Sequence, residues 1–409
     1  MLDASKRGRH AVVIGNGMAA MRVVEEILRI APELYDITVF GAERHGNYNR
    51  ILLSPVLAGE KQVEEIMLNA PEWYARHGIA LHTGDPIVAI DRPRRTVRAK
   101  SGYETTYDRM LLATGSNPFI IPVPGNTLPG VVTFRDLRDV DLMIDAARSH
   151  KKAVVIGGGL LGLEAANGLL RQGMEVSVVH LMDTLMERQL DKHAGAMLKT
   201  SLETRGVSFF MQAQTEAILG SERVTGVRFK DGKEIPADLV VMAVGIKPNI
   251  ELAKTCGLRC ERGVIVDDTL QTFDPRIYAV GECVQHRNAT YGLVAPLWEQ
   301  ANVCATHLAQ MGFARYQGSV TSTKLKVTGI DLFSAGDFAG GEGTEDLVLR
   351  DLKRGVYKRL VLKDNRITGV VLFGDISDGA WYFELMQRGV NISSMRQKLL
   401  FGKSYCEPQ

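Results

Sequence analysis

Cysteine is scarce in this sequence. The 409 residues include five cysteines, an odd number, and no two of them form a Cys-X-X-Cys pair. Proteins that depend on disulfides or zinc have more cysteines, in even numbers or at ligand spacing. We therefore expect free thiols and a reducing, cytoplasmic location. The positions of His193 and His286 also lack ligand spacing, so no metal site is expected.

Excess charge of either sign is lacking as well. The 49 lysines and arginines nearly balance the 47 aspartates and glutamates, which gives a formal net charge of +2. Bulk attraction to nucleic acid or to a membrane is therefore not expected. No apolar run approaches the roughly 18 residues needed to span a bilayer. The polar start MLDASKRGRH lacks the apolar stretch of a secretory signal.

What the chain does contain is one pattern that occurs twice. The first copy is HAVVIGNGMAAMRVVEEIL followed by DITVFGAE, and the second is KAVVIGGGLLGLEAANGLL followed by EVSVVHLMD. Each copy predicts a buried strand, a glycine-rich turn, an apolar-periodic helix and a second buried strand. The sequence therefore predicts an α/β protein with two doubly wound, Rossmann-like dinucleotide-binding domains.

Further strands suggest how the domains are arranged. DRMLLATGSNP closes the first half, ADLVVMAVGIKPN closes the second, and GVIVDDTLQTFDPRIYAVGEC returns the chain to the first domain. We predict a discontinuous first domain, residues 1–117 and 246–318, with residues 118–245 inserted as the second. Short strands, including KLKVTGIDLFSAGDF, and the helical stretches DGAWYFELMQRG and ISSMRQKLL predict a small α+β C-terminal domain at 319–409.

The first glycine-rich motif is GNGMAA, at the end of the strand HAVVI. Gly15 permits the tight turn, Gly17 lets the backbone approach a pyrophosphate, and Ala20 replaces the third glycine where helix packs on strand. Met18 and Ala19 begin the helix, whose N-terminus offers N–H groups to phosphates. A tight turn without a ligand is the competing interpretation.

The second motif, GGGLLGLE, matches the dinucleotide pattern more fully. Gly157, Gly159 and Gly162 are the three required glycines, and Leu160 and Leu161 begin the helix. Two such motifs in one chain predict two nucleotide sites, one for FAD and one for NADH or NADPH.

The sequence leaves the choice between NADH and NADPH open. The strand after the second motif ends in His180, where an acidic residue would favour NADH through its 2′-hydroxyl. His180 suits a neutral hydrogen-bonding role or a partner for a 2′-phosphate. Arg188 suits that phosphate too, or a solvated helix face. We favour NADH.

Five ordered motifs resemble the two-dinucleotide flavoproteins, a pyridine nucleotide-disulphide oxidoreductase-like family that includes ferredoxin and rubredoxin reductases. They are GNGMAA, ATGSNP, GGGLLGLE, VGIKPN and TFDPRIYAVGEC. NYNRILLSPVLAGE, YKRLVLKDNRITGVVLFGDISD and LLFG are most similar to the flavoprotein portion of the assimilatory NAD(P)H-nitrite reductase large subunit. In that family iron–sulfur and siroheme domains follow. No four-cysteine pattern occurs here, so neither group is expected in this chain.

The resemblance implies roles for individual residues. Arg50 would lie near the flavin, where a positive charge favours the anionic reduced form; the competing interpretation is a plain ion pair. Glu164 would orient the nicotinamide carboxamide, against the alternative of a helix-surface acid. Arg50 and Glu164 are thus the candidate catalytic residues. Glu43 is the candidate for binding a ribose.

The remaining candidates also concern the cofactors. Gly281 and Glu282 would meet the FAD ribityl–pyrophosphate region. A helix beginning near Ala295 and Pro296 would direct its N-terminus at the flavin pyrimidine edge and stabilise charge there. The other cofactor-binding candidates are Ala113, Thr114, Gly115 and Gly245.

Taken together, the residues and the resemblance predict an FAD-dependent NAD(P)H oxidoreductase. It would donate electrons to a separate iron–sulfur or haem acceptor, either a nitrate or nitrite reductase or a small ferredoxin. One alternative is a ferredoxin or rubredoxin reductase of an oxygenase system. Another is a redox-responsive NAD(P)H-binding protein without high turnover. Homodimerisation through the C-terminal domain is an expectation by analogy.

Two further expectations concern mechanism and docking. A disulfide mechanism is disfavoured because Ser54 occupies the neighbourhood where related oxidases carry cysteine, and Cys256 and Cys260 lie far along the chain. A basic run between Lys353 and Arg366 predicts either a docking site for an acidic carrier or a solvated strand face.

Overall fold

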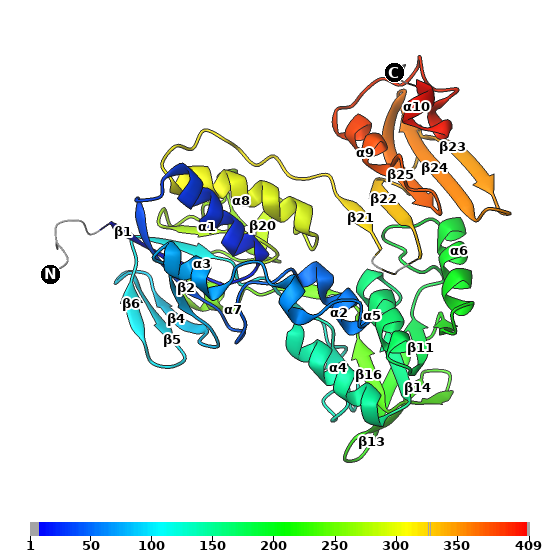
Figure 1. Ribbon diagram of the computed structural model, residues 1–409, viewed down its shortest axis with the longest axis horizontal. Helices are drawn as coiled ribbons and strands as arrows, with labels where there is room; N and C mark the ends of the chain where they lie inside the picture. The colour runs from blue at the N-terminus through cyan, green and yellow to red at the C-terminus, as the bar shows by residue number, and fades with distance from the viewer. Residues whose placement is uncertain (1–7, 326, 328, 407–409) are drawn as a thin grey trace. The chain divides into compact units, whose positions relative to one another are not determined.

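The computed structural model describes residues 8–325, 327 and 329–406. Most of the polar start MLDASKRGRH, where no secretory signal is expected, and part of the predicted strand segment KLKVTGIDLFSAGDF lie outside these residues. Two compact units are formed (Figure 1). The first unit is Met1–Arg50, Val63–Asn117 and Ile246–Ser319, and the second is Ile51–Gln62, Pro118–Gly245 and Val320–Gln409. None of the described helices is long and apolar enough to cross a membrane.

A five-stranded parallel sheet forms the core of the first unit. In order across the sheet its strands are β19 (Ile277–Ala279), β7 (Arg109–Leu112), β1 (Arg9–Ile14), β2 (Tyr35–Phe40) and β3 (Ala80–His82). Strand β1 pairs in parallel with β2 on one side and with β7 on the other. Its residues Val12 and Val13 are buried, as expected of a parallel strand covered on both faces.

Two helices from distant parts of the chain pack against each other in this unit. These are α1 (Met18–Ile30) and α8 (Val294–Leu308), drawn in blue and yellow in Figure 1. The predicted helix start near Val294 is confirmed. The unit's other elements are η2 (Val63–Ile66), α3 (Pro71–Arg76), β17 (Ile246–Pro248), α7 (Glu251–Thr255), β18 (Val264–Val266) and β20 (Val284–His286). Two elements cross the boundary to the second unit: η1 (Arg50–Leu52) begins at Arg50, and β8 (Ser116–Pro118) ends at Pro118.

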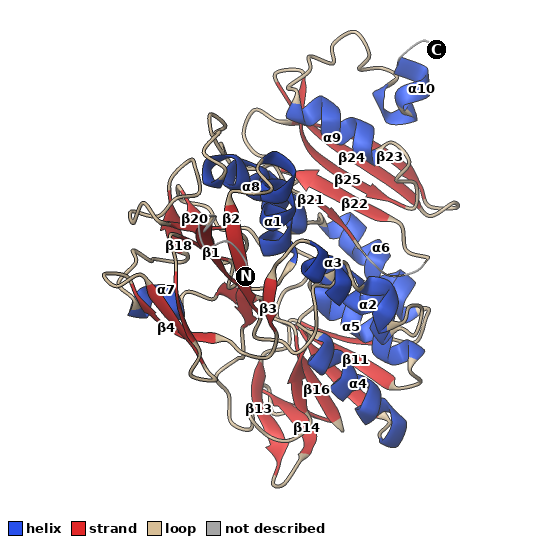
Figure 2. Cartoon of the chain, turned by 60° about the vertical axis from the view of Figure 1, so that its left-hand side comes forward, coloured by secondary structure: helices blue, strands red, loops and turns tan. Residues whose placement is uncertain are grey.

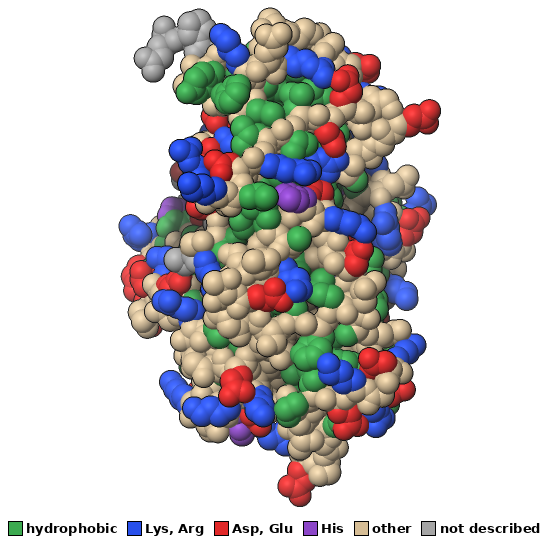
Figure 3. Space-filling view, turned by 90° about the vertical axis from the view of Figure 1, so that its right-hand side faces the viewer, with side chains coloured by type: hydrophobic (Ala, Val, Ile, Leu, Met, Phe, Trp, Pro, Cys, Tyr) green, Lys and Arg blue, Asp and Glu red, His purple; other side chains and the backbone are tan. Residues whose placement is uncertain are grey.

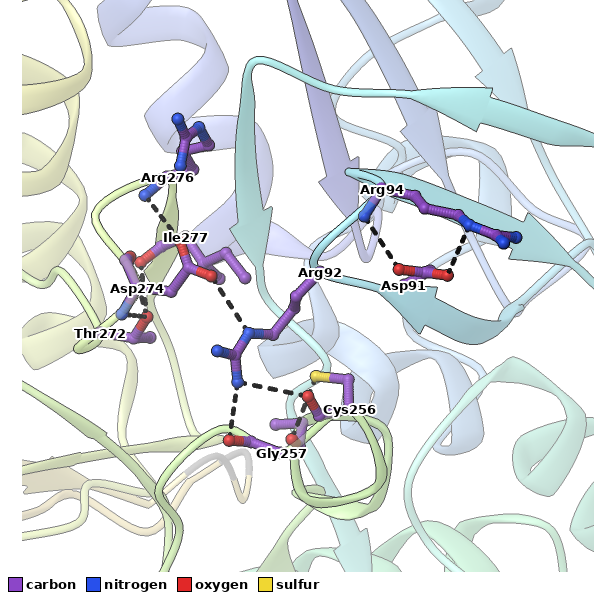
Figure 4. A network of polar contacts seen from close by, with 10 residues as sticks. Asp91, Arg92, Arg94, Cys256, Gly257, Thr272, Asp274, Arg276 and Ile277 are labelled. Carbon is purple, nitrogen blue, oxygen red and sulfur yellow. Dashed lines mark hydrogen bonds and ion pairs between the residues drawn. The ribbon is translucent and has the colours of Figure 1, made fainter.

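A small antiparallel sheet, which sequence reasoning missed, is joined to the return segment by one arginine. The sheet consists of β4 (Ile87–Asp91), β5 (Thr96–Ala99) and β6 (Glu104–Thr106). Arg92 donates from Nε to Asp274 at 3.1 Å and from Nη1 to the Gly257 carbonyl at 2.8 Å (Figure 4).

The second unit contains the second parallel sheet. Its strands, in order, are β12 (Ser208–Met211), β11 (Glu175–His180), β10 (Lys152–Ile156), β16 (Leu239–Met242) and β9 (Val131–Thr133). Strand β10 pairs in parallel with β11 and β16, which repeats the arrangement around β1. The accompanying elements are α2 (Leu53–Leu57), α4 (Leu137–Ser149), α5 (Leu160–Arg171), α6 (Lys192–Glu203), β13 (Thr215–Gly220), β14 (Val224–Phe229) and β15 (Glu234–Pro236).

The C-terminal residues form an antiparallel sheet with one helix packed on it (Figure 2). In order across the sheet, its strands are β21 (Ser322–Lys324), β22 (Leu332–Gly336), β25 (Arg366–Phe373), β24 (Val356–Lys363) and β23 (Glu345–Asp351). The helix is α9 (Gly379–Gln387), where DGAWYFELMQRG predicted one. Within the second unit, the Tyr357 hydroxyl donates to Asp191 at 2.9 Å and joins this sheet to the start of α6.

The predicted fold class is confirmed, with two Rossmann-like sheets and a small α+β C-terminal domain. The helix predicted over ISSMRQKLL is wrong, because that segment forms turns, followed by η3 (Leu399–Phe401) and α10 (Lys403–Cys406). The Asn391 side chain accepts hydrogen bonds from the Ser393 N–H and hydroxyl just before these turns. The contacts of the structure give no further reason for the missing helix.

Candidate functional site

The first glycine-rich turn joins β1 to α1 in the first unit. Gly15 has φ +116°, and a Cβ there would lie 2.2 Å from the Ala113 carbonyl oxygen, so only glycine fits. Its N–H donates to the Phe40 carbonyl at the end of β2. The turn thus lies at the carboxyl edge of the sheet, between strands on either side of β1, where open α/β sheets bind ligands.

Gly17 leaves space in front of helix α1. A Cβ at Gly17 would meet nothing within 4 Å, and no side chain caps this helix. Met18 and Ala19 begin the helix, while Ala20 is fully buried behind them. The Nδ2 of Asn16 is buried and has no hydrogen-bond partner within the described part of the chain. An unpartnered donor beside helix N–H groups suits an anion such as a pyrophosphate.

The ATGSNP and VGEC segments meet in the first unit. Thr114 Oγ1 donates to the Asn249 carbonyl at 2.6 Å, and Ser116 Oγ donates to Glu282 Oε2 at 2.7 Å. Gly115 between them has φ +67°. The structure therefore brings the segment of Thr114 and Gly115 next to Glu282, and both segments are predicted to contact FAD.

Helix α8 is tied to the VGEC segment. The Gly281 N–H donates to Gln300 Oε1 at 2.8 Å, and both residues are buried. Ala295 and Pro296 lie in the first turn of the helix, with Ala295 exposed and Pro296 buried. This hydrogen bond fixes α8 relative to the segment predicted to meet FAD.

Arg50 and Glu43 form an ion pair in the first unit. Arg50 Nη2 lies 2.5 Å from Glu43 Oε1, and the Tyr48 hydroxyl donates to Glu43 Oε2 at 2.6 Å. Burial opposes the charge on Arg50, but Tyr48, Glu43 and Glu282 together raise its pKa. Arg50 is therefore a fixed, permanently charged group. Its role beside a flavin, and that of Glu43 at a ribose, stay predictions.

The second glycine-rich turn repeats this geometry between β10 and α5. Gly157 has φ +121°, and a Cβ there would lie 2.3 Å from the carbonyl oxygen of Ala243, the residue after β16. A Cβ at Gly162 would lie 1.9 Å from the Gly157 oxygen, so helix and strand touch there. Gly159, like Gly17, has nothing within 4 Å of an added Cβ, and Leu160 and Leu161 begin the helix.

Glu164 lies inside the second unit rather than on its surface. The Glu164 side chain accepts a hydrogen bond of 2.5 Å from Ser54 Oγ, and both residues are 4% exposed. The alternative of a helix-surface acid is therefore wrong. Sequence reasoning missed Ser54 as its partner.

Gly245 lies in the second unit, just after β16. It has φ +118°, its carbonyl accepts from the Phe119 N–H at 2.9 Å, and an added Cβ would meet nothing within 4 Å. The candidates predicted for the NAD(P)H side are thus Gly245, Glu164, Leu160, Leu161 and the three glycines of the second motif. The other candidates belong to the first unit.

The cysteines do not form a reactive pair. All five are free. Burial raises the pKa of Cys256, Cys283 and Cys304, and it raises the pKa of Cys260 to about 11. Thiols of this kind are poor nucleophiles at neutral pH. In the described part of the chain, no group of three metal-ligating side chains could hold a metal ion.

The chain was compared with protein families and known proteins. The model of pyridine nucleotide-disulphide oxidoreductases matches residues 9–318, and that of the rubredoxin NAD+ reductase C-terminal domain matches residues 322–390. The nitrite reductase [NAD(P)H] of Bacillus subtilis (strain 168) is 51% identical over 94% of this chain and 48% of its own length. The assimilatory nitrate reductase electron transfer subunit of the same organism is 43% identical over 95% of this chain and 50% of its own length.

A solved structure is similar over the whole chain. The NADH:rubredoxin oxidoreductase of Clostridium acetobutylicum superposes with a TM-score of 0.80 at 26% identity, covering 96% of this chain and 100% of that one. By contrast, the chain spans about half the length of the two Bacillus relatives.

Proposed function

Because the chain belongs to the pyridine nucleotide-disulphide oxidoreductase family, we propose that it passes electrons from NADH or NADPH, through FAD, to a separate acceptor protein. The family binds FAD and NAD(P)H, and the predicted resemblance, enzyme class and cofactors are confirmed. One observation carries the proposal. Each of two parallel sheets has a glycine-rich turn at its carboxyl edge, and each turn has open space in front of the glycine that precedes its helix, Gly17 or Gly159.

On the first unit, the chain's own residues fit FAD. Gly17 and the N-terminus of α1 would hold the pyrophosphate, and Asn16 Nδ2 would find an acceptor there. Thr114 and Glu282 would position the ribityl chain. Arg50 would supply a fixed positive charge near the isoalloxazine ring. FAD, when bound, accepts a hydride and releases electrons singly.

On the second unit, the residues fit a nicotinamide dinucleotide. Gly157 and Gly159 would let the pyrophosphate reach the N-terminus of α5. Glu164 would accept a hydrogen bond from the nicotinamide carboxamide, with Ser54 holding its carboxylate in place. These residues orient and bind, and none needs to exchange a proton, because hydride transfer depends on ring-to-ring geometry.

The acceptor we propose is an iron–sulfur or haem protein of nitrate or nitrite assimilation. Support comes from the names of the Bacillus relatives, a nitrite reductase and an electron transfer subunit. The rubredoxin reductase match at residues 322–390 supports a ferredoxin or rubredoxin acceptor as the second candidate. A cytoplasmic location and a homodimer remain part of the proposal.

Docking through the basic run is only partly supported. Lys358 is 5% exposed and lies 2.6 Å from Asp375, and Arg359 pairs with Asp346 at 2.9 Å. For Lys358, neither alternative, a docking site or a solvated strand face, therefore holds, and Arg359 is engaged by an acid of this chain. On the face that Figure 3 presents, lysines and arginines are interspersed with acids and form no broad patch of one sign. The remaining basic residues of the run are Lys353, Arg354, Lys363 and Arg366. If they attract an acidic carrier protein, the rate at which this chain reduces the carrier should fall with rising salt.

Anaerobic mixing with NADH or NADPH tests the proposal. The expected result is rapid bleaching of the flavin band, followed by rapid reoxidation by ferricyanide and by a purified ferredoxin or nitrite reductase. Slow bleaching with a long-lived charge-transfer band would instead support a redox-responsive binding protein. Transfer to ferricyanide but to no protein acceptor would count against the proposed partner class.

A further inference from the structure

The residue expected to distinguish NADH from NADPH is fully engaged inside the protein. In a Rossmann unit the last residue of the second strand reads the adenosine 2′ position. Here that residue is His180, which is 7% exposed. Its Nδ1 accepts the Gly158 N–H at 3.1 Å, and its Nε2 lies 2.9 Å from the Thr184 carbonyl oxygen.

These two contacts define the state of the imidazole. A carbonyl oxygen only accepts, so Nε2 carries the hydrogen, and Nδ1 carries none because it accepts from a backbone N–H. His180 is therefore neutral and both of its nitrogens are used. It offers no positive charge to a 2′-phosphate and no acceptor to a 2′-hydroxyl.

A carboxylate lies beside this imidazole. Glu187 Oε2 is 3.3 Å from His180 Nε2, and the Glu187 side chain is 32% exposed, so it also reaches solvent. The backbone fixes its position, because the Met186 N–H donates to the Gly158 carbonyl at 2.9 Å and Met186 has φ +51°. The chain thus turns back onto the glycine-rich turn just before Glu187.

The same segment offers a surface for an adenine ring. Leu181 and Met182 directly follow His180 and are 59% and 46% exposed, so two apolar side chains are accessible next to this position. Of the cations nearby, Lys192 is held by Asp183 at 2.7 Å. Arg188 is exposed and is the other cation of the segment 181–192, so it is the residue there that suits binding of a 2′-phosphate.

We propose that Glu187 makes this chain select NADH over NADPH. Its carboxylate accepts a hydrogen bond from the ribose 2′-hydroxyl and repels a 2′-phosphate, so that one group supplies both attraction and rejection. The inference rests on the proposed function, because it assigns the adenosine end of a nicotinamide dinucleotide to the second glycine-rich turn.

Equilibrium binding tests this inference separately from catalysis. The probes are ADP-ribose and 2′-phospho-ADP-ribose, titrated calorimetrically into the FAD-loaded protein. ADP-ribose is expected to bind roughly 10- to 100-fold more tightly. E187Q should remove most of this preference, and E187R should reverse it. Ratios of kcat/KM for NADH and NADPH should follow, with the difference in KM rather than in kcat.

Two control variants decide which charge acts. E175Q removes a carboxylate at the opposite end of β11 and should leave the preference unchanged. R188A should leave it unchanged as well. Equal affinity for the two probes, or a preference that follows Arg188 instead of Glu187, would overturn the inference alone. Failure of both probes to bind would overturn the proposed function together with it.

Discussion

The Ser54 hydroxyl donates a hydrogen bond to the Glu164 carboxylate at 2.5 Å, in a place where both side chains are buried. The two residues are 110 positions apart in sequence and come from α2 and α5. A buried carboxylate is stable only when donors surround it. The contact therefore fixes the Glu164 carboxylate in place, and Ser54 supplies a hydroxyl where related oxidases carry a cysteine.

Substitution of this pair should separate folding from hydride transfer. S54A leaves a buried carboxylate with one donor fewer and should lower the free energy of unfolding in urea by about 1–3 kcal/mol. E164Q keeps the side-chain volume and should slow flavin reduction by NADH about 10-fold or more, with FAD content retained. S54T, which restores a hydroxyl, should recover part of the lost stability. Unchanged reduction by E164Q would remove Glu164 from the nicotinamide site.

Filling the space at Gly17 should abolish FAD binding without unfolding the protein. A valine there meets no protein atom within 4 Å of its Cβ, so the expected folding cost is about 1 kcal/mol or less. The branched side chain would occupy the position proposed for the pyrophosphate. The ratio of flavin absorbance to protein absorbance should therefore fall strongly in G17V.

The matched control for G17V is G341V. Gly341 also has open space around an added Cβ and no positive φ, but it lies in the C-terminal domain. Loss of flavin from both variants, or from neither, would contradict the assignment of FAD to the first turn.

The thiols should be unreactive at neutral pH. Burial raises the pKa of Cys260 to about 11, so at pH 8 only about one thiol in a thousand is ionised. Alkylation of Cys260 by iodoacetamide should be slow at pH 8 and should speed up about tenfold for each pH unit up to about pH 10. Mass spectrometry of timed samples measures this rate against a free cysteine peptide. Alkylation at pH 7 as fast as that of the peptide would show an activated thiol.

Arg92 should matter more for stability than its neighbour Arg94. Arg92 bridges the β4–β6 sheet and the return segment through Asp274 and two carbonyl groups (Figure 4). Its removal in R92M leaves the mostly buried Asp274 without this cation and should cost about 2 kcal/mol.

Arg94 provides the control, because its side chain is 83% exposed and its nearest acid, Asp91, is 3.8 Å away. R94M should change the free energy of unfolding by about 0.5 kcal/mol or less. Equal losses in the two variants, measured by urea unfolding, would show that the bridge contributes nothing particular.

Local patterns in the sequence predicted both Rossmann units, because a buried strand, a glycine turn and a periodic helix are encoded within about 30 residues. Gly15 was predicted because it permits the tight turn, and Gly157 and Gly162 because the motif requires them; the structure adds a close backbone contact at each of the three. Contacts between distant segments were not predictable in this way. The Ser54–Glu164 bond depends on how α2 packs against α5, and the Arg92 bridge depends on where the return segment lies.

The basic run illustrates the same limit. Lys358 lies in β24 on the same face as the buried Leu360 and Leu362, a place where a charged side chain is not expected. Its charge is compensated there by Asp375, which lies 17 positions further on and pairs with it at 2.6 Å. Burial of a charge is decided by a partner, and the partner is found only in three dimensions.

Anaerobic titration of the purified, FAD-loaded protein with NADH tests the central claim most directly. The account predicts that one equivalent of NADH per FAD fully bleaches the flavin band, because one hydride reduces one FAD and no dithiol takes part. Consumption of two equivalents would reveal a hidden disulfide. A folded protein that binds no flavin when it is offered would contradict the account entirely.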